Sequence, residues 1–414
     1  MGNNFVRAIL SGLSQADMLE SFQTCIAVDS KTPWLSLLPE SVRQEFLRRN
    51  YPIDQSKIHQ YPMREIVRLS AGKLGLTSFT QHEQGYACID KVFSELDERV
   101  AAYLKENTGA SQAIYAYEDG ALHSFRQAKT LGLKCLYDLP IAYWQTSRHL
   151  LDEEALRLPD WEPTLGGTRD SSQKLARKEE EASLADVIVV PSSFVYETLP
   201  NDLRNSKRVV VAEFGSPEPR HSSINSTIKD QSISDRNKSL RFLFCGSMSQ
   251  RKGLADIFAA FRLLNNPQAQ LVVMGSPILP LSFYYQQYPD FIHEPVRPNH
   301  KVLELMESCD VFILPSIVEG RAQVQQEAMT CGLPIITTKN AGGEDLIDEG
   351  KTGFLVPVRS PEIIAQKLNW FLENRDKLPE MSKLSQAKAA QVTWDRYRSK
   401  IIKAIKEELA RGHN

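Results

Sequence analysis

The sequence lacks the features that mark nucleic-acid-binding, membrane-spanning and disulfide-stapled proteins. Its 49 Lys and Arg nearly cancel 51 Asp and Glu, and the net charge of -2 leaves no basic excess for neutralising phosphates. No apolar run reaches the length of a membrane span, and the N-terminus lacks the layout of a signal peptide. Paired spacing is absent from the six cysteines, Cys25, Cys88, Cys135, Cys245, Cys309 and Cys331.

These absences predict a chain of a reducing, cytoplasmic compartment, with no metal site and no disulfide framework. Apolar residues at 42% and charged residues at 24% are the balance of a globular protein. Contact with the cytoplasmic face of a membrane stays an open alternative, although no amphipathic basic helix stands out in the first half of the chain.

The chain is long enough for two hydrophobic cores, and its elements alternate regularly. Its 414 residues exceed the size at which a single core stops growing. Short apolar strands such as 187–190 and 311–314 alternate with helices, which predicts parallel sheets covered on both faces. Residues 219–239 are polar and lack periodicity, so we expect a linker there. The predicted fold class is α/β, with two Rossmann-like domains facing each other across a cleft, over 1–218 and 240–384, and a helical segment over 385–414.

The first chemical motif joins a buried strand to a helix. Residues 245–253 read Cys-Gly-Ser-Met-Ser-Gln-Arg-Lys-Gly. Gly246 and Ser247 lie where the backbone can approach a ligand. Arg251 and Lys252 come just before a helix N-terminus, which itself favours anions. Guanidinium geometry and ammonium charge together suit a diphosphate, and a solvated basic turn is the alternative.

The second motif places two carboxylates around a turn and a helix start. Glu319 and Gly320 follow a strand that ends at Pro315, and Glu327 falls within the next helix. Such a turn, at the carboxyl edge of a parallel sheet, is where nucleotides bind, and carboxylates can accept hydrogen bonds from sugar hydroxyls. Taken singly, each glutamate is explained equally by a helix-start or solvated role. Backbone N–H groups that can face phosphate oxygens are expected at Arg321, Ala322, Gln323 and Val324.

A third strand, turn and helix start follows at 339–345, Lys-Asn-Ala-Gly-Gly-Glu-Asp. Its glycines and acids again lie at the expected edge of the sheet. A turn with acids at a helix start explains this segment as well as ligand contact does.

In this order and spacing, the three motifs resemble the retaining glycosyltransferase family 4, among the group 1 glycosyl transferases of the glycosyltransferase B fold. The strongest match is the pair Glu319 and Glu327, with seven residues between them. Agreement covers about 240–357, with support from 183–192. The helix expected over 394–409 resembles the terminal segment of the family, which crosses back onto the N-terminal domain.

The resemblance implies a donor site in the second domain and an acceptor side in the first. Glu319 would contact hydroxyls of the donor sugar, and Glu327 would bind the ribose. Arg251 and Lys252 would stabilise the diphosphate as negative charge grows on the leaving group. The donor would be a UDP-, GDP- or ADP-sugar, with no cofactor and no metal ion required. Gly246, Ser247, Gly320 and the backbone of 321–324 would complete the donor site.

The sequence departs from the family pattern in three places, and the first two concern the phosphates. Family members often carry Arg directly after the glycine that corresponds to Gly246, where this chain has Ser247. The N-terminal glycine-rich turn that normally meets the phosphates is not recognisable near residues 1–30. An aromatic and a small residue usually follow the first glutamate and glycine, where this chain has Arg321-Ala322.

On the acceptor side, the sequence offers polar groups at strand ends and helix starts. Glu118 or Asp119 could bind acceptor hydroxyls, and ordinary turn acids are the alternative. His123 and Asp138 are similar candidates. The aromatic residues Tyr143, Trp144 and Trp161 could stack on a sugar ring, and core packing explains them equally well. The charged run 177–181 is predicted to be a solvated helix face.

The leading hypothesis is a retaining hexosyltransferase that acts by same-face attack on a glycan, a lipid-linked or another hydroxyl acceptor. Polysaccharide biosynthesis follows by analogy with the family. The alternative is a catalytically silent homologue that binds a glycan or a protein partner. A third possibility keeps the fold and changes the reaction to that of an epimerase or a phosphorylase.

Overall fold

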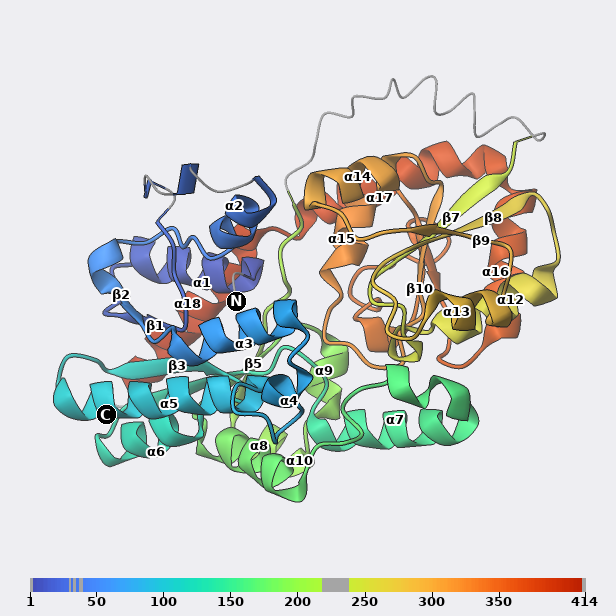
Figure 1. Cartoon of the computed structure of the whole chain (residues 1–414). Helices are drawn as coiled ribbons and strands as arrows, with labels where there is room; N and C mark the ends of the chain where they lie inside the picture. The colour runs from blue at the N-terminus through green and yellow to red at the C-terminus, as the bar shows by residue number, and fades with distance from the viewer. Residues whose placement is uncertain (1–2, 30, 33–34, 37–39, 218–237, 412–414) are drawn as a thin grey trace.

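The computed structural model describes residues 3–29, 31–32, 35–36, 40–217 and 238–411 (Figure 1). The described chain contains three parallel sheets, of two, four and six strands. The predicted linker over 219–239 lies outside the described residues except for its last residue pair, 238–239. The α/β class and the two Rossmann-like domains are confirmed, since each of the larger sheets is parallel throughout and lies among helices.

The sheet of the first domain has the strand order β3-β4-β5-β6. Its central strand β5 is four apolar residues long and buried on both faces, as a covered parallel strand requires. The strands are β3 (Ala113–Tyr117), β4 (Lys134–Asp138), β5 (Val187–Val190) and β6 (Arg208–Val211). The helices between and around them are α5 (Ile89–Glu106), α6 (Leu122–Thr130), α7 (Trp144–Arg157), α8 (Ser172–Leu184), α9 (Ser193–Thr198) and α10 (Asn201–Ser206), with the 3₁₀ turn η3 (Pro159–Thr164).

The N-terminal elements form a small layer of their own. Its first strand is only three residues long and pairs in parallel with a second short strand through Phe22 and Ile58. Prolines at 52 and 62 flank this second strand and keep it short. The elements are α1 (Asn4–Gln15), β1 (Phe22–Thr24), α2 (Glu40–Leu47), η2 (Gln55–Lys57), β2 (Ile58–Gln60), α3 (Met63–Leu74) and α4 (Thr77–Thr80).

The sheet of the second domain has the order β12-β11-β10-β7-β8-β9. Its strands are β7 (Leu240–Cys245), β8 (Ala269–Met274), β9 (Phe291–Glu294), β10 (Val311–Leu314), β11 (Ile335–Thr337) and β12 (Gly353–Leu355). Helices α12 (Leu254–Leu264) and α16 (Pro361–Glu373) pack on one another beside this sheet. The other helices and turns are α13 (Leu281–Gln287), α14 (Asn299–Glu307) and α15 (Gln323–Thr330), with η4 (Gln250–Lys252), η5 (Lys339–Ala341) and η6 (Arg375–Lys377).

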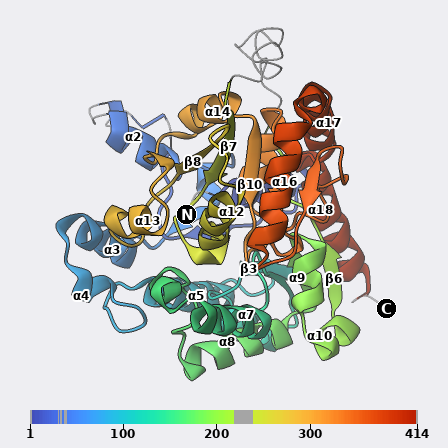
Figure 2. The ribbon, with the colours of Figure 1, turned by 90° about the vertical axis from the view of Figure 1, so that its right-hand side faces the viewer.

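Each domain also receives an element from the other part of the chain. After α17 (Leu378–Gln391), the terminal helix α18 (Trp394–Arg411) runs along the first domain, where Tyr397 and Ile401 share a core cluster with Val187 (Figure 2). In the opposite direction, Trp161 of η3 enters the core of the second domain beside Phe258. Core packing, and not an exposed stacking surface, therefore accounts for Trp161.

Candidate active site

The first motif forms a tight turn between β7 and α12. Gly253 adopts a left-handed conformation with φ of 79°, and a Cβ atom there would lie 2.2 Å from the carbonyl oxygen of Pro315. A side chain at this position would therefore push the two motifs apart. The backbone N–H of Ile317 donates to the carbonyl of Arg251 over 2.8 Å. The turn that carries both basic residues is thus bonded directly to the loop that carries Glu319.

The three residues predicted to be catalytic form one ion cluster. Nη1 of Arg251 lies 2.9 Å from Oε1 of Glu319, and Nζ of Lys252 donates to the same oxygen. Exposed fractions of 26%, 13% and 14% for the Arg251, Lys252 and Glu319 side chains leave the cluster accessible from one side. Burial alone would raise the pKa of Glu319, but the charges of the two cations outweigh it, and the pKa lies below its usual value.

Gln250, one residue before the basic pair, holds the turn in place. Its side-chain amide donates to Glu154 and Asp256, each over 2.7 Å, and its carbonyl accepts from the backbone N–H of Ala255. Arg157 pairs with both carboxylates, at 2.5 Å from Glu154 and 2.8 Å from Asp256, and Arg359 lies 2.7 Å from Glu154. Gln250 is fully buried, so this network fixes where Arg251 and Lys252 point. Sequence reasoning missed it because its members are up to about a hundred residues apart.

The loop after β10 is held from two sides. Thr338 donates through Oγ1 to the carbonyl of Ser316 over 2.7 Å. From the first domain, Ser192 donates through Oγ to the carbonyl of Gly320 over 2.6 Å. A Cβ atom on Gly320 would lie 1.8 Å from the carbonyl oxygen of Pro140, so glycine allows the two domains to touch here.

Arg321, predicted among the donor-binding residues, has its side chain in the contact between domains. The guanidinium is fully buried and donates through Nε to Gln326, 3.2 Å away, while Nη1 lies 3.4 Å from Asp345. Asp345 in turn accepts from the backbone N–H and the hydroxyl of Ser193. The side chain is therefore committed to holding the domains together, and any donor contact at this position falls to the backbone. The third motif, which supplies Asp345, is likewise a brace between domains.

Helix α15 begins directly after this contact. The backbone N–H of Ala322 donates to the carbonyl of Ala341 over 3.4 Å, a long bond. Gln323 and Val324 are the first two helical residues, so their N–H groups have no intrahelical acceptor. Ala322 is thus partly engaged, while Gln323 and Val324 remain the better placed of the backbone donors predicted at this helix start.

Glu327 lies on α15, half-buried, and not on a solvated surface. Its Oε1 accepts a hydrogen bond from Nδ2 of Asn299 over 2.9 Å, and burial raises its pKa. Gly246 directly follows β7 with φ of 154°, a conformation that L side chains rarely adopt, and the hydroxyl of Ser247 lies 3.4 Å from that of Ser249. Gly246 and Ser247 thus lie where β7 ends, and Glu319 follows the end of β10.

The acceptor-side candidates Glu118 and Asp119 are paired within the first domain. Nζ of Lys178 on α8 lies 3.0 Å from Glu118 and 3.2 Å from Asp119. Glu181 is fully buried and accepts from the backbone N–H groups of Asp119 and Ala121. The prediction of a solvated face over 177–181 is therefore wrong. Two of its five residues are buried because they neutralise and cap the turn after β3.

The other two acceptor-side candidates lie apart from this turn. Asp138 is 2% exposed, Tyr115 donates to its Oδ2 over 2.5 Å, and burial raises its pKa to about 7. His123 is an exposed residue in the first turn of α6, with its Nε2 3.9 Å from Glu98. The structure does not gather the four acceptor-side residues into one site, and their contact with an acceptor stays a prediction.

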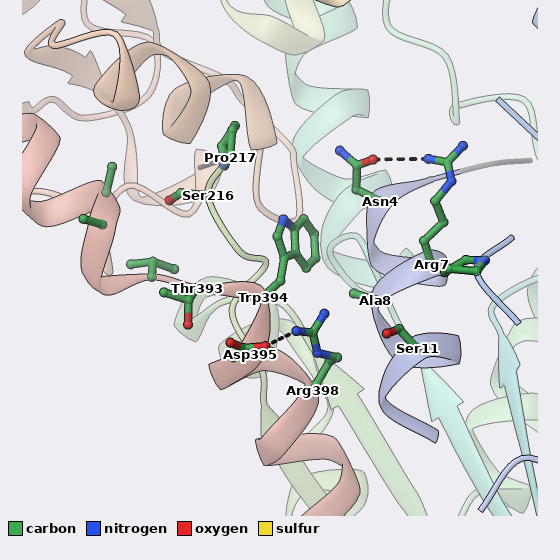
Figure 3. Close-up of a pocket in the computed structure, with 14 residues that line it drawn as sticks. Asn4, Arg7, Ala8, Ser11, Ser216, Pro217, Thr393, Trp394, Asp395 and Arg398 are labelled. Atoms are coloured by element: carbon green, nitrogen blue, oxygen red, sulfur yellow. Dashed lines mark hydrogen bonds and ion pairs between the residues drawn. The ribbon is translucent and has the colours of Figure 1, made fainter. Parts of the chain in front are cut away.

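A cavity of about 600 Å³ lies between α1, α18 and the segment that leaves the first domain (Figure 3). Arg7 of α1 lines it from one side, and Trp394 and Arg398 of α18 line it from the other. Among the described residues that line this cavity, none is a predicted site residue. Ser216 also lines the cavity, and its hydroxyl accepts a hydrogen bond from Nε2 of Gln326 on α15 over 3.2 Å.

One group in the described residues has the spacing of cation ligands. Atoms of His82, Glu83 and Asp170 lie within 4.8 Å of one another on the first domain. The ammonium of Lys174 already lies 3.0 Å from Asp170 and 2.9 Å from Asp90. The carboxylates here are thus balanced by a side chain of the protein, and none of the predicted donor-side residues belongs to the group.

The second half of the chain is similar to known glycosyltransferases. Residues 225–389 match the family model of glycosyl transferases group 1. WcaL of Salmonella typhimurium, assigned to colanic acid biosynthesis as a glycosyltransferase, is 30% identical over 169 residues, which cover 37% of this chain and 41% of that protein. The capsular polysaccharide biosynthesis glycosyltransferase CapM of Staphylococcus aureus is 21% identical over 54% of this chain and 62% of its own. The chain thus spans less than two thirds of these curated relatives.

Solved structures share the fold over most of the chain at low sequence identity. Alr3699/HepE of Anabaena in complex with UDP superposes with a TM-score of 0.57 at 17% identity, over 76% of this chain and 82% of that one. Sucrose-phosphate synthase of Thermosynechococcus elongatus gives a TM-score of 0.59 at 18% identity, over 80% and 82%. The fold is therefore that of the glycosyltransferase B proteins, and residues 225–389 are similar to the glycosyl transferases group 1.

Proposed function

We propose that the chain transfers a hexose from a nucleotide diphosphate sugar to a hydroxyl group of a glycan or lipid-linked acceptor in polysaccharide biosynthesis. The observation that carries this proposal is the ion cluster of Arg251, Lys252 and Glu319. Two cations share one carboxylate, so the cluster holds a net charge of about +1. Helices α12 and α15 begin a few residues after Lys252 and Glu319, and helix N-termini also favour anions. This positive charge would attract the negatively charged diphosphate of a donor.

Donor binding would exchange the partners within this cluster. The diphosphate would accept hydrogen bonds from Arg251 and Lys252 and release Glu319, whose carboxylate would then accept from hydroxyls of the hexose. The N–H groups of Gln323 and Val324 at the start of α15 would donate to the same diphosphate. Glu327, half-buried and with its hydrogen bond to Asn299, would accept from the ribose hydroxyls. This exchange explains why carboxylate and cations occur together at the site.

The chemistry proposed follows the resemblance to the retaining family. The acceptor oxygen would bond to the anomeric carbon on the face from which the diphosphate leaves, and a phosphate oxygen would take the acceptor proton. Arg251 and Lys252 would stabilise the charge that develops on the leaving group, without a metal ion. Alr3699/HepE is described in complex with UDP and with UDP-glucose. We therefore infer that a UDP-sugar is the first donor to test, ahead of GDP- and ADP-sugars.

The test of this proposal is the substitution Lys252→Ala. With the donor that proves active, kcat should fall by about 10²–10³, because one of two cations on the leaving group is removed. The matched control is Lys301→Ala, an exposed lysine of the same domain that pairs with Glu304. It should leave kcat unchanged. Circular dichroism and thermal unfolding check that both variants are folded.

Two further readouts separate the parts of the proposal. Transfer that persists in EDTA supports the metal-free reaction, and nuclear magnetic resonance of the first product reports whether the anomeric configuration is retained. Turnover of Lys252→Ala equal to that of the parent protein would contradict the role of this residue. Sugar release that does not depend on an acceptor would contradict transfer itself.

A further inference from the structure

Arg359 of the second domain holds a left-handed backbone conformation that glycine would adopt more easily. It lies in the loop between β12 and α16, and its φ is 58°. A residue with a side chain adopts this conformation at a cost in free energy, because its Cβ atom crowds the carbonyl oxygen that follows. Such a conformation persists where the surrounding structure stabilises it, so the contacts of the side chain indicate what the strain supports.

The guanidinium of Arg359 clamps a helix of the first domain. Its Nε donates to Oε2 of Glu154 over 2.7 Å, Nη1 donates to Oε2 of Glu153 over 2.8 Å, and Nη2 donates to the carbonyl of Leu150 over 2.8 Å. All three acceptors lie on α7, which Figure 1 shows beneath the second domain. The left-handed backbone thus presents a planar fork of donors to the other domain, and each nitrogen of the fork is engaged.

Glu154 joins this clamp to the turn that carries the basic pair of the predicted diphosphate site. It is 0% exposed, and Arg157 bonds to both of its carboxylate oxygens. Its other partners divide between the two oxygens, because Oε2 accepts from Arg359 and Oε1 accepts from Nε2 of Gln250 over 2.7 Å. Gln250 immediately precedes the basic pair in the sequence. A series of hydrogen bonds therefore runs from Arg359 through two side chains to the start of this pair.

The end of the same first-domain segment holds the backbone of the turn. Oγ1 of Thr164, in η3, accepts from the backbone N–H of Gln250 over 3.0 Å. Trp161 belongs to the core of the second domain, with its ring centroid 5.0 Å from that of Phe283. The segment 144–164 thus belongs to the first domain by sequence and supports the second domain by contact. The basic turn has both its side-chain support and its backbone support from the other domain.

The buried charges beneath the turn are balanced only with Arg359 in place. Glu154 and Asp256 are 0% and 2% exposed, and Arg157 pairs with both of them. Without Arg359, one cation would serve two buried acids, and the group would have to rearrange or take up a proton. Both acids also accept from the side-chain amide of Gln250, so a rearrangement would move the turn.

We propose that Arg359 is a positioning residue for the nucleotide, and that it makes the diphosphate site conditional on the contact between α7 and the second domain. It acts on the basic pair through Glu154 and Gln250 and touches no substrate itself. This inference rests on the proposed function, because the nucleotide that it positions is that of the proposed donor. By linkage, the nucleotide should stabilise the contact of α7 with the second domain to the same degree as the contact favours the nucleotide.

Another ion pair between the domains supplies the matched control. Nζ of Lys339, in η5, lies 2.9 Å from Glu197 on α9. Glu197→Ala removes this interdomain pair and leaves Arg359 and its hydrogen bonds to α7 in place. Comparison of the two sites therefore separates the loss of any interdomain pair from the loss of support for the basic turn.

The test is calorimetric titration of full-length variants with UDP, at a temperature where thermal unfolding shows each of them to be folded. Arg359→Gly removes the clamp and places at this position the residue that the left-handed backbone favours, so backbone strain does not confuse the result. We expect its Kd for UDP to rise about tenfold, within the range of couplings between members of one network. Arg359→Lys keeps the charge without the fork and should recover part of the affinity. Glu197→Ala should leave the Kd unchanged.

Two further readouts report the route of the effect. In a protein that already carries Gln250→Leu, Arg359→Gly should raise the Kd little further, because the series of hydrogen bonds is already broken. Amide hydrogen exchange needs no variant of the buried glutamine. Saturating UDP should slow exchange in α7 of the parent protein, and it should do so much less in Arg359→Gly.

The outcomes separate this inference from the proposed function. Equal Kd values for the parent and Arg359→Gly would overturn the positioning role and leave the nucleotide site intact. Full additivity with Gln250→Leu, or exchange in α7 that bound UDP does not change, would overturn the route through Glu154 and Gln250. A parent protein that binds none of UDP, GDP and ADP would contradict the proposed function, and the inference would fall with it.

Discussion

Replacing Glu319 by glutamine tests whether its carboxylate acts on the sugar or merely holds the two cations. Gln keeps an acceptor oxygen at the same place but removes the negative charge that Arg251 and Lys252 share. In the free protein, two half-buried cations would then lack their counter-charge. We expect Glu319→Gln to lower the free energy of unfolding by about 2 kcal/mol, the scale of one charge-assisted hydrogen bond.

The same substitution has opposite expected effects on nucleotide binding and on transfer. Glu319 competes with the diphosphate for both cations, so its removal should leave the Kd for the nucleotide unchanged or lower it. The sugar, in contrast, loses a charged acceptor for its hydroxyls. We expect kcat/KM to fall by about 10–100-fold, because a hydrogen bond to a charged group contributes about 1.5–3 kcal/mol.

The assay pairs calorimetric titration of the nucleotide with initial rates of transfer. Glu304→Gln is the control, an exposed carboxylate of α14 that pairs with Lys301. Nucleotide binding that weakens as much as transfer does would refute the exchange of partners, because Glu319 would then serve only to position the cations. Transfer at the parental rate would refute its contact with the sugar.

Two further predictions concern the packing beneath the site. Gly320→Ala brings a Cβ atom to 1.8 Å from the carbonyl of Pro140, so thermal unfolding should show a loss of about 1–3 kcal/mol, whereas Gly72→Ala, with open space around it, should show none. Asp138, with a pKa of about 7 in the folded state, keeps a proton that the unfolded chain loses above about pH 4, so stability falls as pH rises from 4 to 7. Asp138→Asn still accepts from Tyr115 and should remove a penalty of order 4 kcal/mol at pH 8 but none near pH 4. Urea unfolding at both pH values checks this, and an equal effect at both would contradict it.

Much of the second domain could be predicted from the sequence because its signals are local. The continuous apolar run 311–314, closed by Pro315, marks β10, and the limits of this strand coincide with the expected ones. Helices α12 and α15 begin where the first and second motifs predict a helix start. Strands β9 and β12 were not expected, since β9 alternates in burial and β12 is three residues long.

The candidate site was only partly predictable for a physical reason. Arg251, Lys252 and Glu319 lie in motifs whose order is visible in the sequence, and the structure brings them together. Gln250 and its buried partners come from three distant segments, and no local pattern announces such a network. Arg321 illustrates the same limit, because only the packed domains reveal that its side chain faces the interface.

The most direct test of the central claim is calorimetric titration of the purified chain with UDP, GDP and ADP, in the absence of acceptor. The account predicts saturable binding of one of them, UDP first, and a loss of affinity in Lys252→Ala that Lys301→Ala does not share. No detectable binding of any of the three would contradict the account, because the ion cluster of Arg251, Lys252 and Glu319 would then hold the fold together without receiving a diphosphate.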